Sequence, residues 1–233
     1  MSEKVQEELI DEMFSAGVHY GYSRSKRHPS MKKAIYGVKS NMEIIDLEKT
    51  VQALATAEEF VTGLAKEGKK ILFVGSKNQI RDVTETQAQR IDMPFVKNRW
   101  IGGTLTNFSE IKKRILRLKD LTEKKEKGEL SMYTKKERLM IDREIEKLEK
   151  NFGGVVSITD VFPAAMFVVD SKSEEIAVNE AVSVGIPVIA ITNSDCDISN
   201  VTYPIPANDS VRASVEFLTR HIVDAYKKGQ VKK

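Results

Sequence analysis

Two aspartates separated by one residue form the pair in this chain that most resembles catalytic machinery. Asp195 and Asp197 lie in the stretch "TNSDCDIS". Such a pair can supply a nucleophile and a general acid for phosphoryl transfer, with a magnesium ion offsetting the charge. That chemistry requires the first aspartate at the end of a strand early in the fold. Here Asp195 comes three residues after the apolar run that closes at Thr192. We therefore expect no phosphoryl transfer, and a metal-dependent phosphohydrolase stays as a rival interpretation.

The other residues with catalytic potential are isolated from one another. The run "LFVGSKNQ" contains the single glycine Gly75, so it lacks both glycine-rich patterns that cradle phosphates. We expect Ser76 and Lys77 to cap the helix that follows, and His221 to pack on the last helix. Cys196 is the one cysteine, and with three scattered histidines it gives no zinc-ligand spacing. The sequence thus predicts that the protein is not an enzyme and uses no cofactor or metal.

The distribution of charge is more informative than its total. The chain has 37 Lys and Arg against 34 Asp and Glu, but no acid occurs in residues 13–42 or 93–109. The first stretch mixes cations that can neutralise phosphates with rings that can stack on unpaired bases, as RNA-binding surfaces do. No neighbouring acid in the sequence pairs these cations, whereas His19, Met31 and Tyr36 fit packing under the loop equally well. The candidate RNA-binding residues here are Tyr20, Tyr22, Arg24, Lys26, Arg27, His28, Lys32 and Lys33.

The stretch "KNRWIGGTLTN", residues 97–107, repeats this composition. Lys97 and Arg99 can contact phosphates, and two adjacent glycines let another backbone approach closely. Trp100 fits two interpretations, a stacking face for RNA or a buried ring in a turn that aims the next segment. Asn107 is a further candidate RNA contact, and it can also cap the helix that follows. We therefore expect a second RNA-binding loop here.

The periodicity of apolar residues indicates the frame that holds these loops. Runs that are apolar on both faces alternate with helical segments, which is typical of a parallel sheet covered on both sides. We predict a doubly wound, flavodoxin-like or Rossmann-like α/β fold. Residues 34–47 are expected to be extended around a turn at Lys39–Asn41, and Asn208 or Asp209 to cap the last helix. The expected strands are 69–76, 93–96, 164–171 and 186–192, and the expected helices 4–15, 48–66, 78–91, 173–185 and 209–228.

An insertion of different character spans residues 107–150. Apolar residues recur at three- and four-residue spacing in both halves, with Lys, Arg and Glu between them, so an antiparallel coiled-coil hairpin is predicted. Thr134 followed by Glu137 fits a capping box at the start of its second helix. We expect residues 1–106 and 151–233 to form the sheet domain around it. A free-standing protein-interaction module built on the hairpin alone is a second rival interpretation.

Hydropathy and cysteine content point to the cytoplasm. The N-terminus "MSEKVQEELIDEMF" is acidic and amphipathic, unlike a secretory signal. No apolar stretch reaches the roughly 20 residues that a membrane span requires. A single cysteine excludes an intramolecular disulfide. We expect a cytoplasmic protein without a membrane partner.

Several segments, in order from about residue 9 to 228, resemble one family, and they include "SAGVHYGYSRSKRHPSMKKAIYG", "FVGSKNQIRDV", "NRWIGGTLTNFSEIKKRI", "GIPVIAIT" and "TYPIPANDSVRAS". The family is that of bacterial ribosomal protein S2 of the small subunit. The resemblance implies a non-catalytic α/β domain with an inserted helical hairpin, placed between head and body of the subunit. It further implies binding to small-subunit ribosomal RNA and to neighbouring ribosomal proteins, with roles in translation and subunit assembly. The large messenger-binding protein S1 is an implied partner in bacteria that have it.

The sequence departs from the family pattern at three places. The family usually has Gly-His and then a tryptophan, where this chain has Gly21-Tyr22 and later His28. Residues 155–165 are bulkier than the usual glycine-rich turn, and residues 192–199 also differ, which leaves contacts of these two segments open. The basic loops are retained. We therefore expect binding through phosphates and the shape of folded RNA more than through base sequence.

Overall fold

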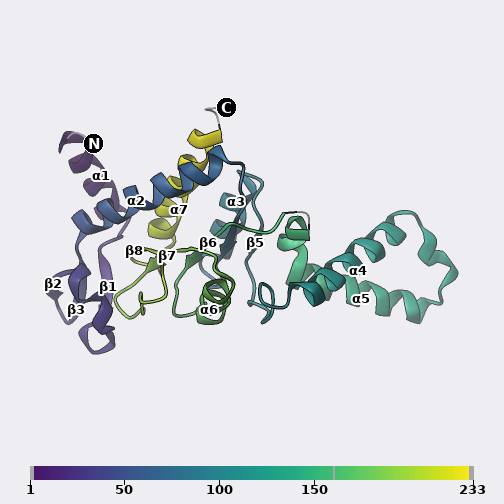
Figure 1. The fold of residues 1–233 in the computed structure, drawn as a ribbon. Helices are drawn as coiled ribbons and strands as arrows, with labels where there is room; N and C mark the ends of the chain where they lie inside the picture. The colour runs from purple at the N-terminus through teal and green to yellow at the C-terminus, as the bar shows by residue number, and fades with distance from the viewer. Residues whose placement is uncertain (1–2, 160, 231–233) are drawn as a thin grey trace.

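A parallel five-stranded sheet forms the centre of the protein (Figure 1). The structure, a computed structural model, describes residues 3–159 and 161–230, so the outermost ends of the predicted sheet domain lie outside the described residues. Counted along the chain, its strands follow the order 2-1-3-4-5 of flavodoxin-like folds. The predicted α/β fold with a parallel sheet is confirmed. In space the strands are β5 (Phe95–Val96), β4 (Ile71–Val74), β6 (Ala165–Val169), β7 (Val188–Thr192) and β8 (Tyr203–Pro206).

Alternate side chains of these strands build two apolar cores, one on each face of the sheet. Phe73 and Phe167 point into one core, with ring centroids 5.2 Å apart, while Leu72 and Met166 point into the other. Because side chains alternate along a strand, strands apolar at every position need cover on both sides. The second core lies against α6 (Glu175–Val184). The first core lies under α1 (Glu3–Ser15), α2 (Leu47–Lys66), α3 (Arg81–Gln89) and α7 (Arg212–Gln230).

A second, antiparallel sheet carries the first acid-free stretch. It consists of β1 (Tyr20–Ser23), β3 (Met42–Ile45) and β2 (Ile35–Lys39), in that spatial order. Ser40 and Asn41 adopt left-handed φ angles of 50° and 65° between β2 and β3, as two-residue hairpin turns require. The predicted extended segment and its turn are confirmed.

The stretch predicted as a loop is more ordered than expected. Besides β1, it contains two 3₁₀ turns, Arg24–Lys26 and Pro29–Ala34. Met31, within the second turn, is fully buried, whereas Tyr36 on β2 is 81% exposed. The packing interpretation therefore holds for Met31 and is wrong for Tyr36.

The inserted segment forms two long helices, α4 (Phe108–Glu126) and α5 (Lys135–Phe152), which project from the sheet (Figure 1). A short 3₁₀ turn joins them at the tip. The capping box predicted from Thr134 and Glu137 is present at the start of α5. Asn107 occupies the cap position of α4, but its side chain makes no capping hydrogen bond there.

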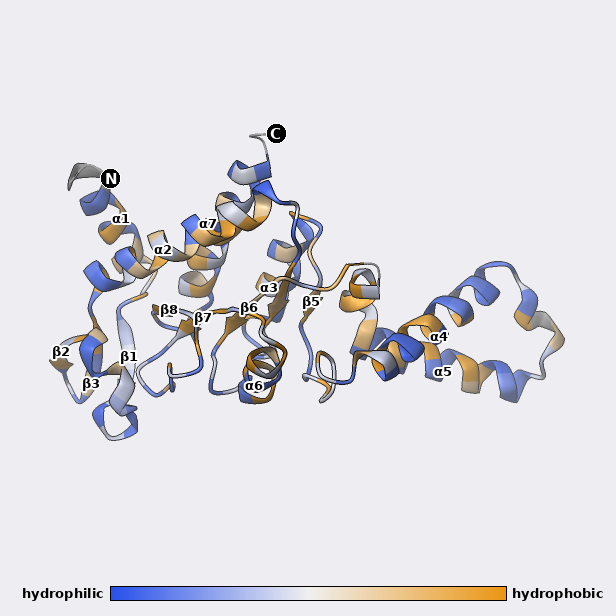
Figure 2. Ribbon diagram, in the orientation of Figure 1, coloured by the Kyte–Doolittle hydropathy of each residue, from blue (hydrophilic) through white to orange (hydrophobic). Residues whose placement is uncertain are grey.

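The apolar faces of the two helices meet each other, and their charged faces point outward (Figure 2). Ile115 and Ile145 lie in this seam. The same apolar cluster continues through Phe152 to Val96 and Leu72 of the sheet. Packing at the base therefore sets the direction of the hairpin. None of the described helices combines the length and the apolarity that a membrane crossing needs.

The chain leaves the sheet through a proline-rich edge strand. Pro204 and Pro206 are tolerated in β8 because this strand lies at the end of the sheet, where one side needs no ladder hydrogen bonds. The Asn208 side chain then accepts hydrogen bonds from the N–H groups of Ser210 and Val211, at 2.9 and 3.3 Å. Asn208 thus fulfils the predicted capping role before α7.

Candidate nucleic-acid interface

The carboxyl ends of the parallel strands, where such folds bind ligands, are filled by the protein's own charges. The Lys77 ammonium lies 2.6 Å from the Asp170 carboxylate and 2.9 Å from that of Asp209. Burial lowers the pKa of Lys77, but the two carboxylates outweigh this and raise the pKa above its ordinary value. The prediction of capping roles is wrong here. Lys77 neutralises two buried acids, and the Ser76 N–H donates to the Glu174 carboxylate at 3.0 Å.

One set of residues at this edge resembles a metal site. Asp170, Cys196 and Asp209 present ligand atoms within 4.8 Å of one another. The Lys77 ammonium already supplies positive charge between the two carboxylates. Burial raises the pKa of Cys196 to about 12, so the thiol stays protonated and is a poor ligand. This cluster therefore fits a stabilising role at the sheet edge better than metal binding.

The two aspartates of the phosphohydrolase interpretation do not face a common cation site. Asp195 pairs with Lys172 at 2.9 Å. Asp197 accepts hydrogen bonds from the N–H and the hydroxyl of Ser199 and lies 3.7 Å from His28. Each carboxylate has its own partner, so the arrangement gives no common position for a cation and a phosphate.

Ser194 anchors the first basic loop, residues 20–34, to the sheet edge. Its hydroxyl accepts a hydrogen bond from the Tyr22 N–H at 2.9 Å, and its carbonyl accepts one from the His28 N–H at 2.9 Å. Gly21 permits this approach, since a Cβ there would lie 3.2 Å from the Ser194 hydroxyl and 3.1 Å from the Glu43 carbonyl. The central sheet thus holds the backbone of the loop.

Two of the predicted RNA-binding residues maintain the shape of this loop. Arg27 donates to the Glu43 carboxylate at 3.1 Å, and the Glu43 side chain is completely buried. His28 Nδ1 accepts a hydrogen bond from the Ser30 N–H at 3.3 Å and caps the second 3₁₀ turn. The expectation that no acid pairs these cations is wrong for Arg27. Glu43 reaches it because β3 pairs with β1.

The other cations of the first basic loop point toward solvent. Arg24, Lys26, Lys32 and Lys33 are exposed, and none of them has an ion-pair partner among the described residues. The Lys26 ammonium lies 5.6 Å from the centre of the Tyr22 ring, within cation–π distance. The fold therefore gathers four unpaired positive charges on one loop.

The aromatic rings of this loop are only partly available. Tyr20 is 48% exposed, and its ring lies 4.0 Å from that of His19. His19 is buried and stacks on Phe14 at 4.3 Å, which agrees with the packing interpretation. The Tyr22 hydroxyl shares a hydrogen bond with Ser210 at 2.8 Å. Tyr20 is thus the more accessible ring for a nucleic-acid base.

The second basic loop, residues 97–107, is organised around Glu180 of α6. The Trp100 indole N–H donates to its carboxylate at 3.1 Å, and the N–H groups of Gly103, Leu105 and Thr106 donate at 2.7, 3.0 and 3.3 Å. Burial raises the pKa of Glu180, but these hydrogen bonds outweigh it and leave the pKa below its ordinary value. Trp100 is only 6% exposed, which supports the buried-ring interpretation against stacking on RNA.

One of the two predicted cations in this loop is already paired. Lys97 donates to both carboxylate oxygens of Glu85 at 2.8 Å. Arg99 is exposed, without an ion-pair partner in the part of the chain that the structure describes. Sequence reasoning missed Glu180 because the sequence does not show which loop packs on α6, so this glutamate resembles any solvated helix residue. The one hint was a glycine-containing turn whose N–H groups needed an acceptor.

Fold and site together define a class of protein. It is a flavodoxin-like α/β protein in which internal ion pairs occupy the carboxyl ends of the parallel strands. Two of its loops carry exposed cations that lack ion-pair partners among the described residues. Residues 13–229 match the family described as Ribosomal protein S2. The chain belongs to this family, whose members are structural proteins and not enzymes, so the predicted absence of catalysis is confirmed along with the family.

Individual relatives agree with this assignment. Each of three is named "Small ribosomal subunit protein uS2". The protein of Acidothermus cellulolyticus is 45% identical over 94% of this chain and 80% of its own length. That of Geotalea uraniireducens is 43% identical over 94% and 86%, and that of Coprothermobacter proteolyticus 42% over 95% and 82%. The likeness therefore extends over nearly the whole chain.

Proposed function

We propose that this chain is a structural constituent of the small ribosomal subunit, where it binds small-subunit ribosomal RNA and neighbouring ribosomal proteins between head and body. Its roles are in translation and subunit assembly. One observation carries the RNA contact: four exposed cations on the first basic loop lack ion-pair partners among the described residues. Arg99 on the second basic loop adds a fifth. Family membership supplies the ribosomal context.

The contact is made mainly to phosphates. Each phosphate that a Lys or Arg neutralises releases condensed counterions, which lowers the affinity as salt rises. Ser194 holds the backbone of the first basic loop and Glu180 that of the second, so the cations sit on a rigid frame. Rigid cations recognise the spacing of phosphates in a folded RNA more than its base sequence.

We divide the candidate site residues into two groups by the contacts that they make within the chain. Arg27, His28, Lys97 and Trp100 hold the loops in shape through the contacts described above. The proposed RNA contacts are Tyr20, Tyr22, Arg24, Lys26, Lys32, Lys33, Arg99 and Asn107.

The wider arrangement is part of the same proposal. Residues 107–150 form an inserted coiled-coil hairpin on a sheet domain of residues 1–106 and 151–233, and both parts contact RNA. The protein works in the cytoplasm bound to the ribosome. Protein S1 is a candidate partner in bacteria that have it.

Sedimentation of cell lysate on sucrose gradients at low and high salt tests the proposal. We expect the protein to migrate with the small subunit and to dissociate increasingly as salt rises. The variant Arg24→Ala/Lys26→Ala should dissociate at lower salt than the wild type. The variant Lys66→Ala/Arg220→Ala removes two exposed cations from α2 and α7 that lack ion-pair partners among the described residues, and it serves as the matched control; Arg220 lies over the Phe217 ring as Lys26 lies over Tyr22.

Two outcomes would contradict the proposal at different levels. Migration as a free protein at both salt concentrations would show that the chain does not work on the small subunit. Equal dissociation of the two double variants would keep the ribosomal role but remove the first basic loop from the interface.

A further inference from the structure

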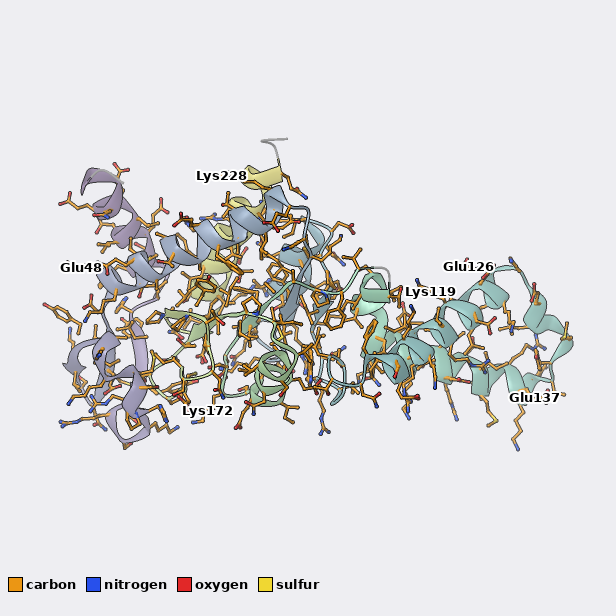
Figure 3. The ribbon with its side chains drawn as sticks, in the orientation of Figure 1. Glu48, Lys119, Glu126, Glu137, Lys172 and Lys228 are labelled. Carbon is orange, nitrogen blue, oxygen red and sulfur yellow. The ribbon has the colours of Figure 1, made fainter. Side chains whose placement is uncertain are left out.

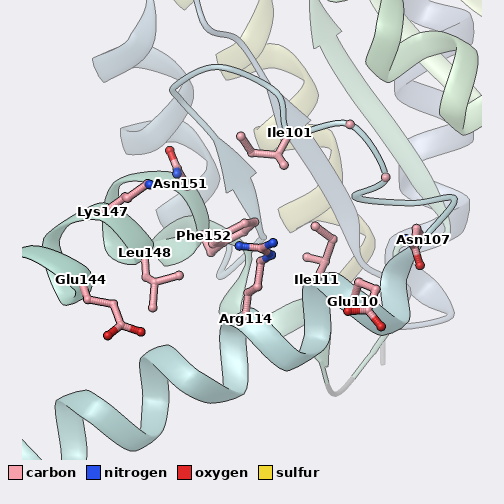
Figure 4. A pocket seen from close by; sticks show the side chains of 12 residues that line it. Ile101, Asn107, Glu110, Ile111, Arg114, Glu144, Lys147, Leu148, Asn151 and Phe152 are labelled. Carbon is pink, nitrogen blue, oxygen red and sulfur yellow. The ribbon is translucent and has the colours of Figure 1, made fainter. Parts of the chain in front are cut away.

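A cleft of about 570 Å³ lies where the hairpin joins the second basic loop. We call it the hairpin cleft. Its wall comes from the glycine turn of the loop on one side and from α4 and α5 on the other (Figure 4). The volume falls within the range of roughly 300 to 1,000 Å³ found for small-ligand sites. The cleft is therefore large enough to admit a single nucleotide.

The acidic residues that line the hairpin cleft are already neutralised. Charged side chains extend from both helices of the hairpin, and several of them pair with one another (Figure 3). Glu110 pairs with Lys113 at 2.6 Å, and Glu144 pairs with Arg117 at 3.2 Å. These two carboxylates consequently offer little net repulsion to an anion.

The cationic residues of the hairpin cleft are unpaired. Arg114 on α4 and Lys147 on α5 are both exposed, and neither has an ion-pair partner among the described residues. Figure 4 shows the Arg114 side chain extending from α4 toward Phe152, with Lys147 on the facing helix. A guanidinium can stack on a base as well as bind a phosphate, whereas an ammonium acts as a point charge. The cleft thus has an excess of available positive charge.

The remaining lining combines an apolar floor with amide groups. Ile111, Leu148 and Phe152 are buried members of the apolar cluster and form the floor. The side chains of Asn107 and Asn151 lie at opposite ends of the cleft (Figure 4). The Asn107 Oδ1 accepts a hydrogen bond from the Ser109 hydroxyl at 3.3 Å, whereas the Asn151 amide, beside Phe152, can supply both donors and an acceptor to a base. Bases are recognised by this combination of apolar or planar surfaces and groups that hydrogen-bond to their edges. A phosphate alone would need no apolar floor.

We propose that the hairpin cleft binds one unpaired nucleotide of an RNA. Its base lies over the apolar floor against the Arg114 guanidinium, the Asn151 amide hydrogen-bonds to the base edge, and Lys147 contacts the phosphate. The inference rests on the proposed RNA-binding function and specifies a subsite of it. It gives the protein one place where a single base, and not only the phosphate backbone, is recognised.

Two double variants with equal loss of charge test this subsite. Arg114→Ala/Lys147→Ala removes the two cations of the cleft. Lys112→Ala/Lys150→Ala removes two cations from the same helices that are also exposed and lack ion-pair partners within residues 3–159 and 161–230, but that do not line the cleft. Because counterion release depends on the number of charges, both variants should lose the same salt-dependent part of the affinity for small-subunit RNA. At a fixed salt concentration, the RNA affinity of Arg114→Ala/Lys147→Ala should be roughly tenfold lower than that of the control variant, which is the effect expected for the loss of one base contact.

A photo-crosslinking residue at position 107, which lines the cleft outside the proposed base contact, identifies the occupant in reconstituted small subunits. We expect a crosslink to one RNA nucleotide, and 2′-hydroxyl probing should show that this nucleotide becomes reactive only in the cleft variant. A crosslink to a protein, or equal affinity of the two double variants, would overturn the subsite. If AMP alone binds saturably and competes with the RNA, the cleft is a site for free nucleotides, and the proposal that an RNA nucleotide occupies it is wrong. Failure of the wild type to bind RNA would instead contradict the proposed function.

Discussion

The two acid-free stretches look alike in sequence but differ in the folded protein. In residues 13–42, four of the five candidate cations stay exposed and unpaired among the described residues, and only Arg27 meets an acid. In residues 93–109, Lys97 is paired and Trp100 is buried, so only one cation stays available. The acids that pair with these cations come from other elements: Glu43 pairs with Arg27 and Glu85 with Lys97. Glu180 instead accepts hydrogen bonds from the second basic loop.

The difference has a physical origin in where each stretch packs. The first basic loop begins with β1 of the antiparallel sheet, and its 3₁₀ turns and Ser194 supply further partners for its backbone groups. The second basic loop covers the apolar face of the central sheet without a ladder of its own, so its N–H groups require another acceptor. Glu180 fills that role. The absence of acids along the chain therefore describes local composition and not the charge that a partner meets.

Removing the acceptor of the second basic loop should have the largest effect. We expect Glu180→Ala to lower the free energy of unfolding by about 3–5 kcal/mol, because several buried donors then lack a partner and each costs about 1–3 kcal/mol. Urea unfolding measures this. Glu180→Gln keeps an acceptor oxygen and should recover part of the loss. A loss below about 1 kcal/mol would mean that the loop refolds around another acceptor.

The ion pair of the first basic loop should contribute less. Arg27→Met leaves the Glu43 carboxylate buried without a partner, and we expect a loss of about 1–3 kcal/mol, since the Arg27 side chain is 26% exposed and partly screened. The double variant Arg27→Met/Glu43→Met removes the stranded charge and should be more stable than Arg27→Met in the same urea titration. Equal stability of the two would show that water reaches Glu43.

The pH dependence of stability separates the two regions further. The pKa of Glu180 is lower in the folded than in the unfolded protein. The contribution of ionised Glu180 to the free energy of unfolding is therefore fully present above the unfolded pKa of about 4.3, and it is lost as the pH falls through the folded pKa. The stability difference between wild type and Glu180→Gln should be constant above about pH 5.5 and shrink in acid below about pH 4.3. Urea midpoints measured across this range give the difference. A difference that grows in acid would reverse the assigned direction of the pKa shift.

Single surface cations should show the smallest effects on stability and a clear contrast in binding. Arg24→Ala and Lys97→Ala are each expected to leave the urea midpoint nearly unchanged, because both positions are accessible to water. Arg24→Ala should reduce the slope of log K against log salt by roughly 0.7–0.9, the value of one phosphate contact. Lys97→Ala should leave the slope unchanged because Glu85 already neutralises Lys97. Equal slopes of log K against log salt for the two variants would show that the two loops do not differ in their available charge.

Much of the fold follows from local pattern. The run "KKILFVGS" is apolar at every position of the observed strand Ile71–Val74, and only a buried strand of a parallel sheet needs that. The hairpin helices and the capping box at Thr134 likewise depend on residues three and four apart. β1 was not predicted, because "YGYS" is short and its pairing with β3 spans more than twenty residues of chain.

For the candidate site, the sequence alone determined which residue types are present and that acids are missing around two groups of cations. Tertiary structure decided which of those cations are free. It brought Glu43 under Arg27, Glu180 against Trp100, and Lys77 between two buried aspartates. The physical reason is that helical and strand periodicity acts over a few neighbouring residues. A buried ion pair instead depends on the distance between groups far apart in the chain, which exists only once the sheet has assembled.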